Sequence, residues 1–199
     1  MNGLIKKFVK NFWSLNVDEA LVANWLKNNL KNNYEVFFPI NAQLEYIDLI
    51  VYNKQNKKTT TIQVKSSQSY IEKDKDGDYW VSGHRFESNK IKSKKVDFFI
   101  FTCFYPKTPK KNQPDRGIME HYVVFKTREL EKYIETYKKI KITKTGKIGF
   151  SFYVYPPNDK GKLYEDWQLK EEYTRNDYTK LDPLSNVMDN FNKIKQELK

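Results

Sequence analysis

The stretch Leu44–Ser66, LEYIDLIVYNKQNKKTTTIQVKS, decides the expected fold of this chain. It has the pattern of a β-hairpin, with an apolar arm over Glu45–Tyr52, a polar turn over Asn53–Lys58 and a β-branched arm over Thr59–Ser66. β-branched and apolar residues favour strands, and a short polar segment between two such arms favours an antiparallel return. The sequence therefore predicts a sheet built around this hairpin.

Three of the polar side chains within the two arms indicate a functional site. Asp48 interrupts the first arm, and Gln63 and Lys65 flank Val64 in the second. Because successive side chains of a strand point to opposite faces, Gln63 and Lys65 share one face. Such groups are costly to bury without partners. A carboxylate, an amide oxygen and an ammonium that meet across two paired strands predict a Mg²⁺ site beside a lysine that orients water, and the alternative is an ordinary ion pair of Asp48 with Lys65.

The net charge of +11 is unevenly distributed along the chain. Residues 159–199 hold 8 basic and 9 acidic side chains, a net −1, so residues 1–158 carry +12. An excess of this size on the part that contains the hairpin favours a polyanionic partner, namely nucleic acid. The alternative is a lysine-rich composition that serves solubility alone.

The length and composition predict a protein with one main domain in the cytoplasm. An apolar fraction of 39% suffices for a core over 199 residues. No secretory signal or membrane-spanning run is found, so we expect no membrane association. The single cysteine, Cys103, excludes an internal disulfide and a cysteine-based zinc site, and its apolar neighbours predict a buried thiol.

The remaining chain alternates between helical and strand patterns. We expect a helix that Asn16 caps, strands over Tyr34–Pro39, Tyr79–Ser82, Val96–Phe104, Glu120–Phe125 and Lys147–Tyr155, a loop with a short helix over His84–Lys95, and a helix that Thr127 caps and that extends to about Lys139. Val96–Phe104, VDFFIFTCF, is the most apolar of these runs and predicts a strand buried on both faces.

A change in composition at Pro156 divides the chain into a core over residues 1–155 and a C-terminal helical extension over residues 156–199. We expect helices over Leu163–Glu172 and from Asp182 to Lys199, the second with one apolar stripe. The whole order predicts a mixed α/β fold in which helices flank a mixed central β-sheet.

The order of a helix with Glu19, a strand with Asp48, a strand with Gln63-Val64-Lys65 and a later buried strand resembles the PD-(D/E)XK nuclease superfamily, the fold of many restriction endonucleases. The resemblance covers roughly residues 16–104 and implies a restriction endonuclease-like core. It also implies hydrolysis of phosphodiester bonds with Mg²⁺, for which Mn²⁺ can substitute.

The resemblance assigns a role to each residue of the motif. Asp48, Gln63 and the carbonyl of Val64 match the metal ligands, Glu19 matches the helix acid that supports them, and Lys65 matches the lysine that serves the attacking water. Gln63 departs from the more frequent glutamate, because its amide oxygen can ligate Mg²⁺ but adds no negative charge. Glu19 could instead be only a carboxylate that stabilises the start of its helix.

The expected function is that of a DNA endonuclease most like a type II restriction enzyme, acting on both strands as a homodimer. The residues expected to hold DNA phosphates are Arg85, Lys90, Lys92, Lys94 and Lys95, with a solvated helix face as the alternative. His84 could contact phosphate or belong to a loop. Two other functions stay open: a nuclease selective for junctions or repair intermediates, and a nuclease-fold module that binds nucleic acid without catalysis.

Overall fold

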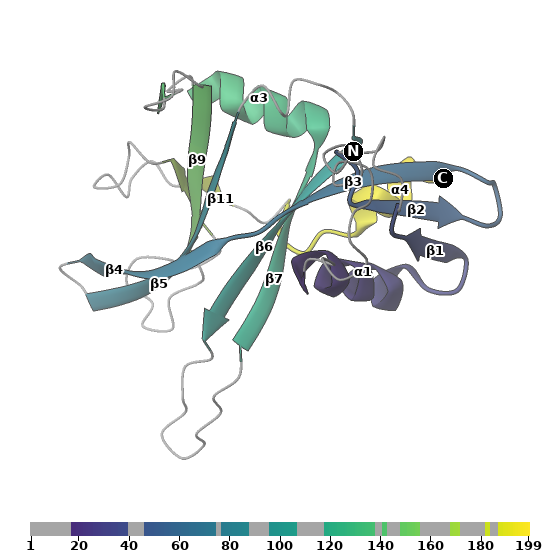
Figure 1. Cartoon of the computed structure of the whole chain (residues 1–199), viewed down its shortest axis with the longest axis horizontal. Coiled ribbons are helices and arrows are strands. Elements are labelled where there is room, and N and C mark those ends of the chain that lie inside the picture. Colours follow the sequence, from purple (N-terminus) through teal and green to yellow (C-terminus); the bar gives the residue numbers. More distant parts are fainter. Residues whose placement is uncertain are drawn as a thin grey trace, which may run out of the picture.

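The structure is a computed structural model of the chain, and it describes residues 17–39, 46–74, 77–87, 96–106, 118–137, 141–142, 148–155, 168–171, 182–183 and 187–199. These residues form a mixed α/β fold with two sheets and three helices (Figure 1). Within the described ranges, no helix has the length and apolar character needed to cross a membrane.

The first sheet has five strands and is built around the predicted hairpin. Its strands, in spatial order, are β1 (Tyr34–Phe37), β2 (Leu49–Asn53), β3 (Thr59–Lys65), β6 (Phe98–Pro106) and β7 (Ile118–Lys126). β3 and β6 are parallel, whereas all other neighbours are antiparallel. A parallel pair needs a long crossover, and here the crossover between β3 and β6 contains strands of the second sheet.

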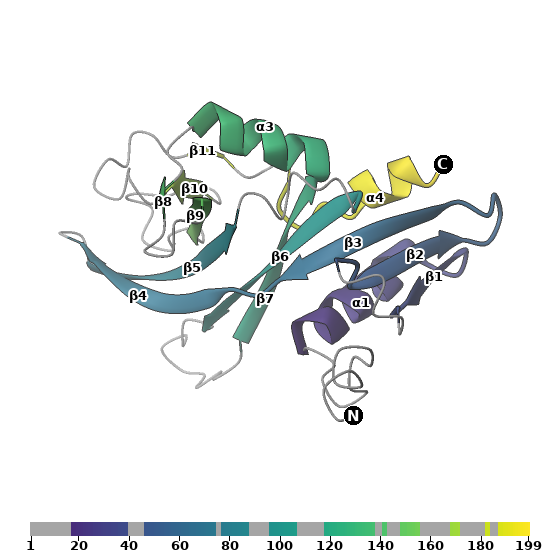
Figure 2. The same cartoon turned by 45° about the horizontal axis from the view of Figure 1, so that its top comes forward.

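The second sheet is antiparallel and branches from the end of β3. Its strands are β4 (Gln68–Asp74), β5 (Gly77–Glu87), β9 (Ile148–Tyr155), β10 (Gln168–Glu171) and β11 (Asp182–Pro183), with β8 (Lys141–Ile142) beside β9. Only two residues separate β3 from β4, so the chain passes almost directly from one sheet into the other (Figure 2). The end of β3 therefore lies at the junction of the two sheets.

Two apolar clusters cover opposite faces of the first sheet. On one face, α1 (Val17–Leu30) and α4 (Asn192–Glu197) pack against Ile62, Val64 and Ile100. On the other face, α3 (Thr127–Tyr137) and β9 pack against the alternate residues of β6, among them Phe99 and Phe101. β6 is buried from both sides, as its predominantly apolar sequence predicts.

The edge of β7 is covered by the chain that precedes α4. Met188 forms a β-bridge with Val123, and the carboxylate of Asp189 accepts the N–H of Tyr122 at 2.7 Å. The second oxygen of Asp189 lies 2.7 Å from Nδ1 of His121. These bonds satisfy backbone groups that an edge strand would otherwise expose.

The structure corrects several expected elements. Leu163–Glu172 is not a helix over its described part, because Gln168–Glu171 is strand β10. The expected helix from Asp182 to Lys199 is wrong at its start: Asp182–Pro183 is strand β11, and the described helix begins at Asn192. The C-terminal extension is thus only partly helical among its described residues. Strand β10 pairs with β9 and β11 pairs with β10, because this pairing satisfies backbone groups at the edge of the second sheet.

The segment expected as a loop with a short helix also differs. β5 continues through His84 to Glu87, and residues 88–95 lie outside the described part. Thr127 does not cap its helix through its side chain but donates its hydroxyl to the carbonyl of Val96. Glu129 instead accepts the N–H of Lys126 at the start of the helix.

Candidate metal and phosphate site at the end of β3

Asp48 lies where the two arms of the hairpin separate. It directly precedes β2 rather than standing inside that strand, and its N–H donates to the carbonyl of Ile62 at 2.9 Å. Its carboxylate Oδ2 accepts the N–H of Val64 at 2.8 Å. The side chain thus replaces the backbone carbonyl that a longer β2 would offer to β3. This bond places the carboxylate against the Gln63-Val64-Lys65 segment.

The carbonyl of Val64 is directed to the same side of β3. In a strand, the N–H and C=O of one residue point to the same neighbour. Because the N–H of Val64 reaches Asp48, the Val64 carbonyl also points toward the side of β2, beyond the last ladder pair of Leu49 with Ile62. A carboxylate and a backbone carbonyl therefore lie at one strand end.

Gln63 and Lys65 occupy the face of β3 opposite Val64. Their register partners on β6 are Phe99 and Phe101, which belong to the cluster on the α3 side. Lys65 is half-buried, whereas Gln63 is only 6% exposed. The structure thus brings Asp48, Gln63 and Lys65 to the junction of the two sheets, with Asp48 and Lys65 reaching solvent.

Two buried oxygens near Lys65 have no hydrogen-bond partner among the described residues: Oε1 of Gln63 and Oγ of Ser67. Leaving a buried polar atom unpaired costs about 1–3 kcal/mol. Oxygen atoms are the ligands that Mg²⁺ prefers, so an unpaired amide oxygen beside the Asp48 segment fits a bound cation. Ser67 was not predicted from the sequence, where Ser66-Ser67 after Lys65 is only a weak signal.

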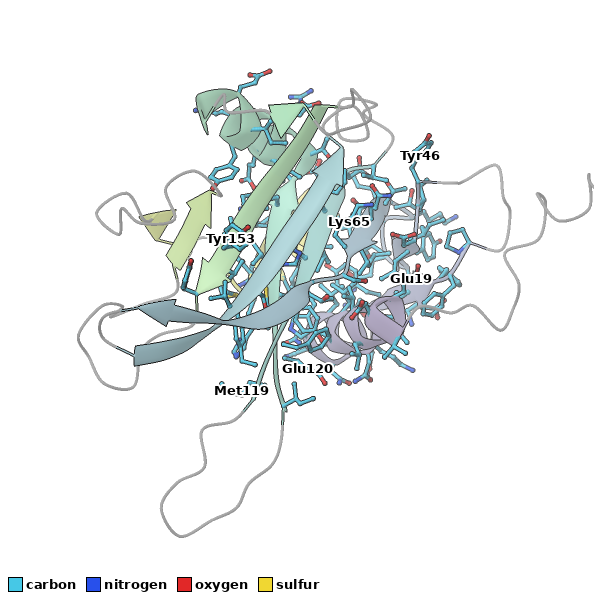
Figure 3. The ribbon with its side chains drawn as sticks, turned by 60° about the vertical axis from the view of Figure 1, so that its left-hand side comes forward. Glu19, Tyr46, Lys65, Met119, Glu120 and Tyr153 are labelled. Atoms are coloured by element: carbon cyan, nitrogen blue, oxygen red, sulfur yellow. The ribbon has the colours of Figure 1, made fainter. Side chains whose placement is uncertain are left out.

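Glu19 lies on α1, which packs on the face of the first sheet opposite to that of Gln63 and Lys65. It is 7% exposed and begins the buried stripe that α1 turns toward the sheet, which continues through Val22 and Leu26. A solvated helix-cap acid would not lie on that stripe. Figure 3 shows Glu19 and Lys65 on the same flank of the molecule, with Tyr46 on that flank too.

The first turn of α1 is linked to the end of β3 through Thr102 on β6. The hydroxyl of Thr102 lies 3.4 Å from Oδ1 of Asp18 and 3.4 Å from the carbonyl of Lys65. The helix that carries Glu19 is thereby held beside the strand that carries Lys65. The only sequence signal for Thr102 is a single hydroxyl in an otherwise apolar run.

His84 lies in the core behind the site and does not contact solvent as a phosphate ligand would. It is 2% exposed, its Nε2 lies 3.6 Å from Sγ of Cys103, and its ring packs edge-on against Phe101. Burial lowers the pKa of His84 to about 3, although a hydrogen bond with the Ser66 backbone raises it slightly. Burial also raises the pKa of Cys103 to about 12. Both groups are therefore neutral, and the expected phosphate or loop role of His84 is wrong.

The buried imidazole predicts a loss of stability in acid. His84 binds a proton below pH 6.5 in the unfolded chain but only near pH 3 in the folded one, so falling pH favours unfolding between these values. At pH 5 the free energy of unfolding should be about 2 kcal/mol lower than at neutral pH on account of this group. Urea unfolding of the wild type and of His84→Gln at pH 7.5 and pH 5 measures this contribution. The titration of all other groups affects both proteins equally, so the difference between their pH dependences reports His84 alone. An identical pH dependence of the two proteins would contradict the assignment.

The predicted phosphate-binding residues lie largely beyond the described part of the chain. Lys90, Lys92, Lys94 and Lys95 are outside it, and for Arg85 the structure describes only the backbone, which pairs with Ser151 of β9. Within the described residues, no group of three or more histidine, cysteine, aspartate or glutamate side chains is placed to hold a metal ion. The oxygen groups that the structure brings to the end of β3 are the carboxylate of Asp48, the amide of Gln63 and the carbonyl of Val64, with Glu19 on the opposite face of the sheet.

Comparison of the chain with protein-family models, with curated proteins and with solved structures finds no match. The assignment of a function therefore depends on the site and on the arrangement of the strands around it.

Proposed function

We propose that the protein is a Mg²⁺-dependent endonuclease that hydrolyses phosphodiester bonds in DNA, most like a type II restriction enzyme. The observation that carries the proposal is the 2.8 Å hydrogen bond from the N–H of Val64 to the carboxylate of Asp48. It joins an acid to a strand segment whose next residue is a half-buried lysine. Acid, amide and lysine at one strand end are the groups that such a reaction needs.

The arrangement of elements supports the same proposal. α1 precedes the antiparallel strands β1, β2 and β3, and β6 lies parallel to β3. This order resembles the core of the PD-(D/E)XK nucleases. The crossover from β3 to β6 differs, because it contains the β4–β5 hairpin among its described residues.

The residues at the end of β3 fit a hard divalent cation. Asp48, Oε1 of Gln63 and the carbonyl of Val64 would hold Mg²⁺ or Mn²⁺, and Glu19 would support them. The unpaired Oε1 of Gln63 is the observation that supports this fit. When bound, such an ion lowers the pKa of water and offsets charge that develops on phosphate oxygens.

Lys65 has the complementary role at the reacting phosphate. Its ammonium donates to a phosphate oxygen and orients the attacking water. Its half-buried position strengthens this interaction, since partial exclusion of water lowers the effective dielectric constant around the charge. The excess of +12 on residues 1–158 attracts the polyanionic substrate.

Cleavage of both strands is expected from a homodimer, because a two-fold axis in the protein matches the two-fold symmetry of a duplex. The structure describes a single chain, and the dimer belongs to the proposal.

Incubation of the purified protein with phage and plasmid DNA in Mg²⁺, Mn²⁺ or EDTA tests the proposal. Discrete fragments that require the metal support a restriction-like enzyme. Cleavage confined to branched oligonucleotides would favour the junction or repair nuclease instead. Metal-independent binding without hydrolysis in either metal would contradict catalysis and leave a nucleic-acid-binding module, which the neutral Gln63 makes the second candidate.

Gln63→Glu should tighten the apparent affinity for Mg²⁺ by about tenfold, a change of about 1.4 kcal/mol, because it adds a negative charge at a ligand position. Without metal, the same substitution should lower stability, since it buries a second carboxylate beside Asp48. The half-saturating Mg²⁺ concentration for cleavage and the Mg²⁺-induced rise in unfolding temperature measure both effects. Gln63→Ala is the control and should weaken metal binding; equal metal dependence of all three proteins would exclude Gln63 as a ligand.

A further inference from the structure

Two lysines at the far end of the hairpin adopt a backbone conformation that ordinarily favours glycine. Lys31 has φ 65° and Lys57 has φ 60°. Lys31 directly follows α1, where glycine or asparagine is usual, and Lys57 lies in the β2–β3 turn, where glycine is also usual. A residue with a Cβ atom is strained in this region. Strain at a position that glycine would relieve indicates that the lysine side chain serves a purpose.

The two turns that carry these lysines are joined to one another and to the core. The N–H of Lys54 donates to the carbonyl of Asn33 at 2.9 Å, and the N–H of Lys57 donates to the carbonyl of Asn53 at 2.9 Å. The amide of Asn56 donates to the carbonyl of Leu198 at 2.6 Å, which ties the β2–β3 turn to the residues after α4. The lysines are thus presented by a fixed backbone, which reduces the entropy lost when they bind a partner.

The surface formed by these turns is strongly basic. We call Lys27, Lys31, Lys54, Lys57 and Lys58 the hairpin-tip surface, and all five are exposed. In the described residues of these two turns and of β1, the only acid is Glu35, which lies 3.6 Å from Lys54. Five lysines against one glutamate leave a net charge of +4. Figures 1 and 2 both show the two turns together at one end of the first sheet.

The geometry points to the hairpin-tip surface as a second phosphate-binding surface for the duplex DNA that the proposed nuclease cuts. This inference rests on the proposed function and deepens it. Val64 lies seven positions after Lys57 along the turn and β3, which is about 23 Å of extended chain. Duplex DNA rises about 3.4 Å per base pair, so the contacted phosphates lie roughly seven base pairs from the scissile bond.

A double substitution, Lys31→Gly with Lys57→Gly, tests whether these lysines bind phosphates or only form a solvated surface. Glycine removes both the strain and the two charges, so the urea midpoint should rise while DNA affinity falls. Loss of two phosphate contacts should lower affinity on the order of tenfold or more near 0.1 M salt and reduce the slope of log K against log salt by about 1.8. Fluorescence anisotropy of a labelled duplex in EDTA measures binding apart from cleavage.

Two further variants make the outcome decisive. Lys31→Gln with Lys57→Gln removes the charges but keeps the strain, so binding should fall without a gain in stability. Arg128→Gln with Lys132→Gln removes the same charge from the exposed residues of α3 and should leave binding unchanged.

Glycine and glutamine variants with wild-type affinity and salt slope would overturn the inference and leave the nuclease proposal intact. A wild type that binds no duplex would overturn both. A third outcome also counts against the hairpin-tip surface: an equal loss of affinity in the α3 variant would mean that binding depends on total charge only.

Discussion

Replacing Lys65 by alanine is expected to slow DNA cleavage by a factor of about 10²–10³, because the variant loses a charged donor at the reacting phosphate. Lys65 is half-buried at the end of β3, next to Val64, whose N–H holds Asp48 at 2.8 Å. The rate should be measured in single turnover with saturating Mg²⁺ and DNA, so that binding does not limit it. Binding of the uncut duplex in EDTA should fall only slightly, because one of 36 basic side chains is removed.

Asp48→Asn separates the two roles of Asp48, which are the negative charge for the metal and the hydrogen bond that supports the fold. Asparagine keeps an oxygen that can accept the N–H of Val64, so the fold should persist while the charge for the metal is lost. Cleavage should fall at least as far as in the lysine variant, with the unfolding midpoint nearly unchanged. Lys132→Ala on α3 serves as the matched control and should cut normally. Wild-type cutting by either site variant would contradict the proposed roles.

The part of the site that was predictable lies within one hairpin. Alternation along β3 separates Gln63 and Lys65 from Val64, and the turn sets which end of β2 meets them. Both facts are local in sequence, so pattern alone indicates them. The exact contact of Asp48 was not predictable, because it depends on β2 beginning at Leu49, one residue after the acid, rather than before it.

Contacts between distant segments were the part that could not be predicted. Thr102 links α1 to the end of β3 only because β6 is the parallel neighbour of β3. His84 lies in a run of polar residues that indicates a loop, yet β5 packs it against Cys103 and Phe101. No periodicity in the sequence of β5 reveals which neighbouring strand will bury the His84 side chain.

The end of the chain shows how one apolar stripe can be used in two ways. Val187 and Met188 match helical spacing with Ile194 and Leu198, which supported a continuous helix. In the structure, Ile194 and Leu198 pack against the cluster on the α1 side of the sheet. The carbonyl of Val187 instead accepts the N–H of Val124, and Val187 and Met188 pack against the cluster on the α3 side. The free edge of β7 offers backbone hydrogen bonds that outweigh helical propensity at those positions.

Replacing Phe101 by alanine is expected to lower the free energy of unfolding by about 3–5 kcal/mol, the usual loss for a large aromatic side chain in a core. Phe101 is fully buried, and its ring packs edge-on against His84 at 5.1 Å and against Phe125 at 6.1 Å. Urea unfolding measures the effect. Phe37→Ala, at a ring that is 47% exposed, is the control and should cost under about 1 kcal/mol.

The position of Phe101 adds a second readout, because the ring joins the two sheets. His84 belongs to β5 of the second sheet, while Phe101 and Phe125 belong to the first. Without the ring, the sheets are still joined by the hydrogen bond from the Tyr105 hydroxyl to the Val154 carbonyl at 2.9 Å and by the 3.6 Å contact of His84 Nε2 with Cys103 Sγ. Backbone amides of β5 and β9 should therefore exchange faster with solvent, by more than those of β2 and β3. Uniform acceleration in both sheets would mean that they unfold as one unit, and that the site at their junction does not depend on how the second sheet docks.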